Sequence, residues 1–198
     1  MTIDMKAIHD STHTLVMGVL NITEDSFSDG GLWLDPANAK AHGEAMMKDG
    51  ADIIDIGAES TRPGVPGAKR VSEEDEQTRV LGAVDALIPE GAVLSIDTKR
   101  ASVARMALEH GAQIINDVSG GRLDREVPHV VAEHSESLYI VQHWRGWLAG
   151  SAGDVPDADT SVYANGVVDD VYDELMKQVD DVLQAGVSPS QIIIDPGL

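Results

Sequence analysis

The sequence predicts an α/β fold in which parallel strands alternate with helices. Six short runs of apolar, β-branched residues recur along the chain, and helix-start and helix-stop residues lie between them. The runs are almost continuously apolar, which is typical of strands buried on both faces of a parallel sheet. Polar residues stand where nearly every run ends. This favours a TIM (β/α)8 barrel, which builds its site from most strand ends on one rim, over a doubly wound sheet, whose site lies at one switch point.

The expected strands begin and end at recognisable places. They span residues 14–20, 52–57, 93–97, 113–117, 138–143 and 191–195. The polar residues at or just beyond their ends are Asn21, Glu59, Asp97, Asn116, Asp117, Gln142, His143 and Asp195. Right-handed crossovers would bring these ends to the same side of the sheet.

Helix signals occupy the segments between the strands. Asp35 and Pro36 are an N-cap and a favourable first-turn residue, and Gly50 suits the position after that helix. Ser72 and Asp75 resemble a capping box, with Asp in place of the usual Glu or Gln. Helices are also expected over 100–111 and 167–186, and a long Gly-, Asp- and Ser-rich loop over 144–164.

The length is short for this architecture. An eight-unit barrel typically takes about 250 residues, whereas the chain has 198 residues and ends directly after its sixth strand. We therefore expect one domain over residues 1–198 that holds only about the first six βα units and is incomplete at its C-terminus. We also expect these residues to be inactive by themselves.

Composition excludes several classes of function. The formal net charge of −20 repels phosphate backbones and anionic lipid, so we expect no nucleic-acid partner and no membrane. No cysteine is present, which excludes thiol nucleophiles and disulfides. The N-terminal residues do not read as a signal peptide, and a cytoplasmic location is expected.

The first candidate segment is "NITEDSFSDGG", residues 21–31. Asn21 offers a neutral carbonyl oxygen, which suits Mg²⁺ that is otherwise held by substrate phosphates. Ser26 could order around a ligand, and Phe27, the only Phe in the chain, could cover it. The alternative is a loop that is polar only because it is exposed.

The second candidate segment is "GAESTRPGVPG", residues 57–67, in which Thr61 and Arg62 follow a strand. A guanidinium forks onto phosphate or carboxylate, so Arg62 is a plausible anion contact in this acidic chain. An ion pair with a surface acid is the alternative.

Three further strand ends could meet in one pocket. Asp97, Asn116 and Asp195 would together match a heterocycle rich in N–H donors and would stabilise positive charge that develops on it. Helix capping is the alternative for such residues, especially for Asp117 and the neighbouring Thr98. Asp55, inside the second strand, could face the barrel interior. A lone histidine such as His143 is more often structural than catalytic.

Taken together, "MGVLNITEDSFSDGG", "IIDIGAESTRPG", "SIDT", "IIND", "HWRG" and "IIIDPG" resemble the dihydropteroate synthases of the folate pathway, a pterin-binding family. The motifs occur in the family's order over nearly the whole chain. The resemblance implies a (β/α)8 barrel that condenses p-aminobenzoate with 6-hydroxymethyl-7,8-dihydropterin diphosphate, with Mg²⁺, to give 7,8-dihydropteroate and diphosphate. It also implies a homodimer for the full-length protein.

The resemblance assigns roles to individual residues. Asn21 matches the Mg²⁺-binding asparagine, Thr61 a contact to the pterin diphosphate, and Arg62 a mobile-loop arginine. Asp97, Asn116 and Asp195 match the pterin-binding residues. The segment with Ser26 and Phe27 matches the first mobile loop, which helps to build the p-aminobenzoate pocket. As catalytic residues we expect Asp97, Asp195 and Arg62.

The chain also departs from the family pattern. Gln142 stands where Met is usual, and the family's Ser-Arg-Lys and Arg-x-His motifs of strands seven and eight are absent. The alternative function is a non-catalytic or methyltransferase-type pterin-binding barrel. The "DSFSDGG" and "STRPG" segments favour the synthase, because they match the loops that bind p-aminobenzoate.

Overall fold

The computed structural model describes residues 8, 10–23, 35–59, 71–145 and 162–197. Within them one parallel sheet has its strands in the order β1-β2-β3-β4-β5-β6. The strands are β1 (Met17–Asn21), β2 (Ile53–Gly57), β3 (Leu94–Asp97), β4 (Ile114–Asp117), β5 (Leu138–Gln142) and β6 (Ile192–Asp195). A doubly wound sheet reverses its strand order at a switch point, whereas this order never reverses. The barrel prediction is therefore confirmed, in the form of a partial barrel.

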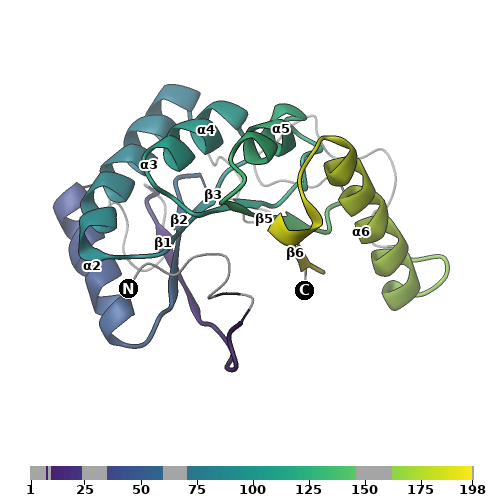
Figure 1. Cartoon of the computed structure of the whole chain (residues 1–198), viewed down its shortest axis with the longest axis horizontal. Coiled ribbons are helices and arrows are strands. Elements are labelled where there is room, and N and C mark those ends of the chain that lie inside the picture. The colour runs from purple at the N-terminus through teal and green to yellow at the C-terminus, as the bar shows by residue number, and fades with distance from the viewer. Residues whose placement is uncertain (1–7, 9, 24–34, 60–70, 146–161, 198) are drawn as a thin grey trace.

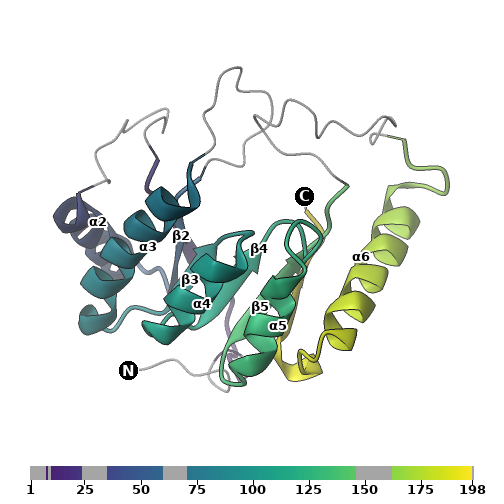
Figure 2. The same cartoon turned by 90° about the horizontal axis from the view of Figure 1, so that it is seen from above.

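The helices cover one face of this sheet. They are α2 (Pro36–Lys48), α3 (Glu73–Leu87), α4 (Ala101–Glu109), α5 (Glu126–Glu133) and α6 (Val167–Gln184), with short 3₁₀ turns η2 (Ile88–Glu90) and η3 (Pro189–Gln191). Figure 1 shows them as an arc around the strands, and the view from above places α3, α4 and α5 side by side (Figure 2). The opposite, concave face of the sheet is the inner side of the arc.

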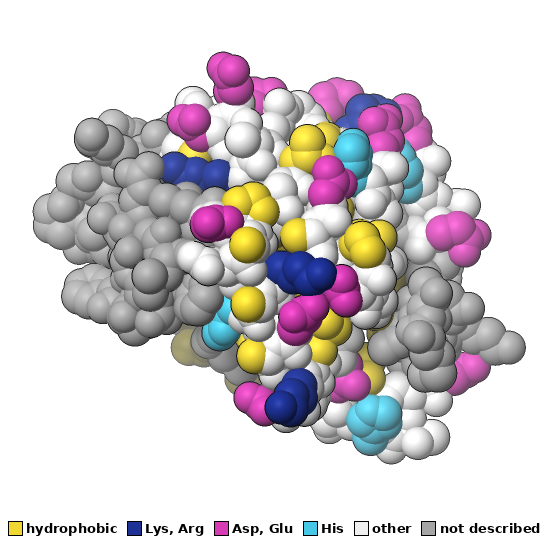
Figure 3. Space-filling view, turned by 90° about the vertical axis from the view of Figure 1, so that its left-hand side faces the viewer, with side chains coloured by type: hydrophobic (Ala, Val, Ile, Leu, Met, Phe, Trp, Pro, Cys, Tyr) yellow, Lys and Arg dark blue, Asp and Glu magenta, His cyan; other side chains and the backbone are white. Residues whose placement is uncertain are grey.

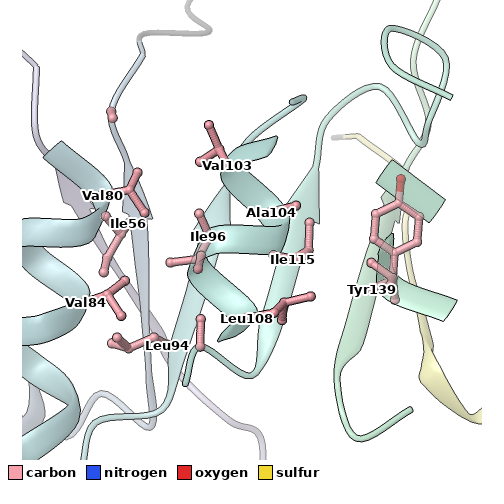
Figure 4. Close-up of a cluster of buried hydrophobic side chains, with 14 of the residues drawn as sticks. Ile56, Val80, Val84, Leu94, Ile96, Val103, Ala104, Leu108, Ile115 and Tyr139 are labelled. Atoms are coloured by element: carbon pink, nitrogen blue, oxygen red, sulfur yellow. The ribbon is translucent and has the colours of Figure 1, made fainter. Parts of the chain in front are cut away.

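The main hydrophobic core lies between the sheet and the helices. Ile56, Ile96 and Ile115 project from neighbouring strands towards α3 and α4 and are fully buried. Val84 of α3 and Val103 of α4 meet them there (Figure 4). Burying such a side chain contributes about 1.5–3 kcal/mol relative to exposure, so this layer carries most of the stability of the described part.

A second, smaller cluster lies on the concave face. Its buried members come from the N-terminal halves of the strands: Ile53, Val93, Ile114, Leu138 and Ile140. Successive strand residues point to opposite faces, so residues two and four places further along the same strands also face inward. Hydrophobic side chains therefore close the floor of the concave face, and polar ones follow towards the C-terminal rim.

Most predicted helix ends are confirmed. Asp35 accepts a hydrogen bond from the Ala37 amide at the start of α2, and Ser72 accepts one from the Asp75 amide at the start of α3. Gly50 and Gly186 follow α2 and α6 with φ values of +109° and +103°. Helix α5 was not predicted, because it has eight residues and no side-chain cap at Arg125.

The surface is strongly acidic yet locally paired. In Figure 3, basic side chains lie beside acidic ones, with hydrophobic residues scattered between them. Lys40, for example, pairs with Glu90 at 2.5 Å and with Glu44 at 3.6 Å. Among the described helices, none is both long enough and apolar enough to cross a membrane.

Candidate functional site

Strand register aligns polar residues in one row at the rim of the concave face. Asn21 pairs with Gly57, Gly57 with Asp97, and Asp97 with Asn116. All four lie an even number of residues beyond inward-facing Met17, Ile53, Val93 or Ile114, so they face inward as well. Neighbouring parallel strands lie about 4.8 Å apart, which brings these side chains within reach of one small ligand.

Gly57 leaves a space between its two neighbours in this row. A Cβ at this position would lie 3.3 Å from Asn21 Oδ1 and 3.5 Å from Asp97 Oδ2. The amide oxygen and the carboxylate therefore converge over the glycine from the two adjacent strands. A side chain there would occupy the volume that both oxygens border.

The Asn116 side chain is hydrogen-bonded to Asp55. Its Nδ2 donates to Asp55 Oδ2 at 3.2 Å, and Asp55 is 5% exposed. The other oxygens of the pair, Asn116 Oδ1 and Asp55 Oδ1, are buried without a hydrogen-bond partner. Orphaned buried acceptors are costly, and they mark the place where the N–H groups of a ligand would be accommodated best.

The carboxyl groups in this pocket resist ionisation. Burial, together with the neighbouring Asp55 and Asp117 carboxyls, raises the pKa of Asp97 to about 8, although the Lys99 ammonium acts to lower it. Burial also raises the pKa of Asp55, although Ser95 and Asn116 counteract it. Perturbed carboxyls that share one pocket are typical of functional sites.

Asp195 stands at the same rim, two strands beyond Asn116. It pairs with Gln142, and the backbone carbonyl of Asp195 accepts from the His143 amide at 2.8 Å. Its Oδ1 accepts from the Gly197 amide at 2.8 Å, which closes a turn at the strand end. Asp195 lies two residues beyond Ile193, which packs on the concave cluster, so its side chain belongs to the concave face.

Asp117 and Thr98 have structural roles, but the capping alternative is wrong in detail, because the N-caps of α4 and α5 are Arg100 and Arg125. Asp117 is fully buried and accepts from the Ser119 amide and hydroxyl, the Gly121 amide and the Tyr139 hydroxyl. Thr98 accepts from the Arg100 amide just before α4. Neither side chain is available to a ligand.

Four predicted site residues, Ser26, Phe27, Thr61 and Arg62, lie outside the described residues. Their roles stay predictions. The last residue described before this segment is Glu59, two residues before Thr61. Lys99 Nζ donates to its Oε2 at 2.6 Å.

Helix α6 contributes contacts that the sequence patterns did not indicate. Glu174 binds the Arg145 guanidinium through both oxygens, at 2.7 and 2.9 Å, and lies 2.8 Å from His143 Nε2. The fully buried Gln178 donates to the carbonyls of Ser119 and Gln142. His143 is therefore buried and held by Glu174 of α6, as expected for a structural histidine. The only sequence feature that could have indicated these contacts is a polar residue, Gln178, on the apolar side of an amphipathic helix.

The described residues contain no group of three or more His, Asp or Glu that could hold a metal ion by themselves. A cavity of ≈ 210 Å³ lies on the outer side, between α5 and α6, with Arg122, His129 and Asp181 among its lining residues. None of the rim-row residues lines it, so we do not assign it to the site.

Comparisons with known proteins agree with this geometry. The family model "Pterin binding enzyme" matches residues 17–198. The chain is 46% identical over 183 residues to the dihydropteroate synthase of Mycobacterium leprae, covering 92% of this chain and 61% of that protein.

Two solved structures show the same fold. Xanthomonas albilineans dihydropteroate synthase with 4-aminobenzoic acid has a TM-score of 0.76 and 35% identity, covering 94% of this chain and 62% of that one. The Burkholderia cenocepacia enzyme complexed with 7,8-dihydropteroate has a TM-score of 0.74 and 35% identity, with coverages of 94% and 59%. The chain thus spans about three fifths of the length of these relatives.

The family model matches almost the whole chain, and one relative is 46% identical. The strand register places four residues in the rim row: Asn21, Gly57, Asp97 and Asn116. The chain belongs to the pterin binding enzyme family, and its similar relatives are dihydropteroate synthases.

Proposed function

We propose that this chain forms the pterin-binding part of a dihydropteroate synthase. The observation that carries the proposal is the meeting of Asn21 Oδ1 and Asp97 Oδ2 over Gly57, in one row with Asn116. The reaction joins p-aminobenzoate to 6-hydroxymethyl-7,8-dihydropterin diphosphate. The relatives support it, since one is described with 4-aminobenzoic acid and another with 7,8-dihydropteroate.

Asp97, Asn116 and Asp195 bind the pterin ring in this proposal. The ring presents N–H donors, and the carboxylates and the free Asn116 Oδ1 accept them. Because hydrogen bonds from a ligand stabilise the charged form, ring binding would draw the pKa of Asp97 down from about 8. A proton would then leave the site as the ring binds near neutral pH.

Asn21 is the proposed Mg²⁺ ligand. Its Oδ1 is a neutral oxygen at the rim, which suits a hard cation otherwise held by phosphate oxygens. When bound, Mg²⁺ would neutralise charge on the diphosphate. Thr61 and Arg62 are proposed to bind the same diphosphate, and Ser26 and Phe27 to border the p-aminobenzoate.

The chemistry needs no enzyme nucleophile. The C–O bond between the pterin methylene and the diphosphate breaks, and the electron pair leaves with the diphosphate. The aryl amine forms the new C–N bond to the methylene and then loses its proton to solvent or to the leaving group. Asp97 and Asp195 stabilise the positive charge that develops on the pterin in a water-poor site, where such stabilisation is strongest.

The test measures 7,8-dihydropteroate formation by the protein encoded by the complete reading frame that contains these residues. It is supplied with both substrates and Mg²⁺, and Asp97→Ala and Asn116→Ala are assayed beside it. Turnover in the parent and a loss of at least about 100-fold in both variants is expected. Tight 6-hydroxymethylpterin binding without turnover would instead identify a pterin-binding barrel of another function.

A further inference from the structure

A partly buried cluster of charged side chains lies just outside the rim row. Lys99 Nζ contacts Glu59 Oε2 at 2.6 Å, with the two side chains 17% and 12% exposed. Arg100 pairs with Glu76, whose side chain is 3% exposed, and its Nη1 lies 3.5 Å from the same Glu59 oxygen. Two cations and two carboxylates thus balance each other in an enclosed space.

The cluster joins the two places where the described chain leaves β2 and enters α3. Glu59 lies two residues beyond Gly57, at the end of β2. Arg100 Nη2 donates to the carbonyl oxygen of Val71 at 3.0 Å, one residue before Ser72, the N-cap of α3. One guanidinium therefore contacts both flanks.

The same cluster is attached to the strand ends that carry the site. Lys99 lies two residues beyond Asp97. Between them, the Thr98 hydroxyl donates to Glu76 at 2.6 Å, and the Thr98 amide donates to the Asn116 carbonyl at 3.1 Å. The ends of β2, β3 and β4 are consequently bound to one another through these groups.

Burying four charges is an expensive way to gain stability. The desolvation penalty can equal or exceed the attraction, so an apolar cluster of the same volume would often be as stable. What this cluster provides is geometry, because Lys99 donates to Glu59, Thr98 to Glu76 and Arg100 to the Val71 carbonyl, each in a defined direction. The exposed Lys40–Glu90 pair, whose side chains are 39% and 35% exposed, lacks this enclosure.

We propose that Lys99 and Arg100 are positioning residues of the pterin site. They hold the ends of β2 and β3 in the relative position that lets Asn21 and Asp97 converge over Gly57. The proposal rests on the proposed function only for its kinetic readout. Neither residue needs to contact the substrate for this role.

The test compares Lys99→Met and Arg100→Lys in the full-length protein. Arg100→Lys keeps the charge beside buried Glu76, but one ammonium cannot reach Glu76, Glu59 and Val71 together. Matched controls are Lys40→Met and Arg105→Lys, since Arg105 forms an exposed pair with Glu133 at 2.6 Å. Thermal unfolding establishes that each variant is folded.

Two readouts decide the proposal. Both test variants should lose about tenfold in kcat/KM for the pterin diphosphate, mainly through KM, while the controls stay within about twofold. Amide exchange of peptides covering 56–59 and 71–75 should be about tenfold faster in Arg100→Lys and unchanged in α5.

Other outcomes overturn the inference or the function separately. Parent-like kinetics and exchange in both test variants, or equal losses in the controls, would refute the positioning role. A general fall in kcat with unchanged KM would show a merely structural role and refute it as well. If the parent neither turns over nor binds 6-hydroxymethylpterin, the proposed function fails, and the exchange pattern still decides the positioning role.

Discussion

Asn116 of β4 donates to Asp55 of β2 across the intervening strand β3, with 3.2 Å between Nδ2 and Oδ2. The bond selects one orientation of the amide, because only Nδ2 can donate to a carboxylate oxygen. It leaves Asn116 Oδ1 as a buried acceptor without a partner. Asp55 thus determines which atom of Asn116 a ligand meets.

Replacing Asp55 tests this arrangement. Asp55→Ala removes the acceptor and frees the amide to rotate, so we expect the dissociation constant for 6-hydroxymethylpterin to rise about tenfold. Asp55→Asn keeps an acceptor oxygen and should stay within about threefold. Fluorescence titration of the pterin measures both, and equal affinity in Asp55→Ala and the parent would contradict the prediction.

Replacing Asp97 should abolish pterin binding but increase the stability of the fold at high pH. The pKa of Asp97 is about 8 in the folded chain against 3.8 for an ordinary aspartate, so its stabilising contribution is complete below about pH 3.8, falls as pH rises above that value and is lost by about pH 8. Asp97→Asn cannot ionise. We expect it to abolish pterin binding, yet to raise Tm relative to the parent by more than roughly 4 °C at pH 9.

The control for Asp97→Asn is the same comparison at about pH 3, below the ordinary aspartate value of 3.8, where the parent carboxyl is protonated in both the folded and the unfolded chain. There the two proteins should melt within about 1 °C of each other. Differential scanning calorimetry without ligand measures both conditions. A Tm difference independent of pH would show that Asp97 does not titrate as described.

Gly57→Ala tests the open space at the centre of the row. The added Cβ would approach Asn21 Oδ1 to 3.3 Å and Asp97 Oδ2 to 3.5 Å, contacts that small side-chain shifts can relieve. The fold should persist with a stability change of about 1 kcal/mol or less, whereas kcat/KM should fall at least about tenfold.

Gly82→Ala is the matched control for Gly57→Ala. Its Cβ would meet Pro36 Cγ at a similar 3.2 Å, but in the helical layer and without contact to any residue of the rim row. Urea denaturation and initial rates are measured for both variants. Parent-like kcat/KM in Gly57→Ala would show that the space over this glycine is not used.

Asp117 should matter for stability rather than for chemistry. Asp117→Ala leaves the Ser119 and Gly121 amides and the Tyr139 hydroxyl without their acceptor, and we expect a loss of about 3 kcal/mol in the free energy of unfolding. Tyr139→Phe removes one donor only and should cost about 1 kcal/mol. Urea denaturation measures both, and equal losses would disprove this division.

Much of the architecture could be predicted from local patterns. Buried parallel strands need continuous apolar runs, so all six strands were found to within three residues at each end. Helix α5 was missed because eight residues with an uncapped start carry too little local signal. The single domain, the homodimer, the cytoplasmic location and the Mg²⁺ requirement stay predictions.

The candidate site divides in the same way. Asn21, Asp97, Asn116 and Asp195 could be found because each lies at a strand end or one residue before it. The capping alternative for Asp117 was wrong, because its carboxylate binds the amides of the following turn rather than a helix start. Local sequence could not reveal the contacts of Glu174 and Gln178 or the Lys99–Glu59 pair. The contacting residues lie 31–40 positions apart, and local sequence does not show where a helix packs.

The sequence by itself determined the strands, their order of appearance and the chemical character of their ends, because these depend on side-chain polarity and on spacing over a few residues. Only the tertiary structure decided the register that aligns Asn21, Gly57, Asp97 and Asn116, the burial that raises the pKa of Asp97, and the partners of each charge. Those properties arise from atoms distant in the chain that share one volume and exclude water from it, which no local pattern encodes.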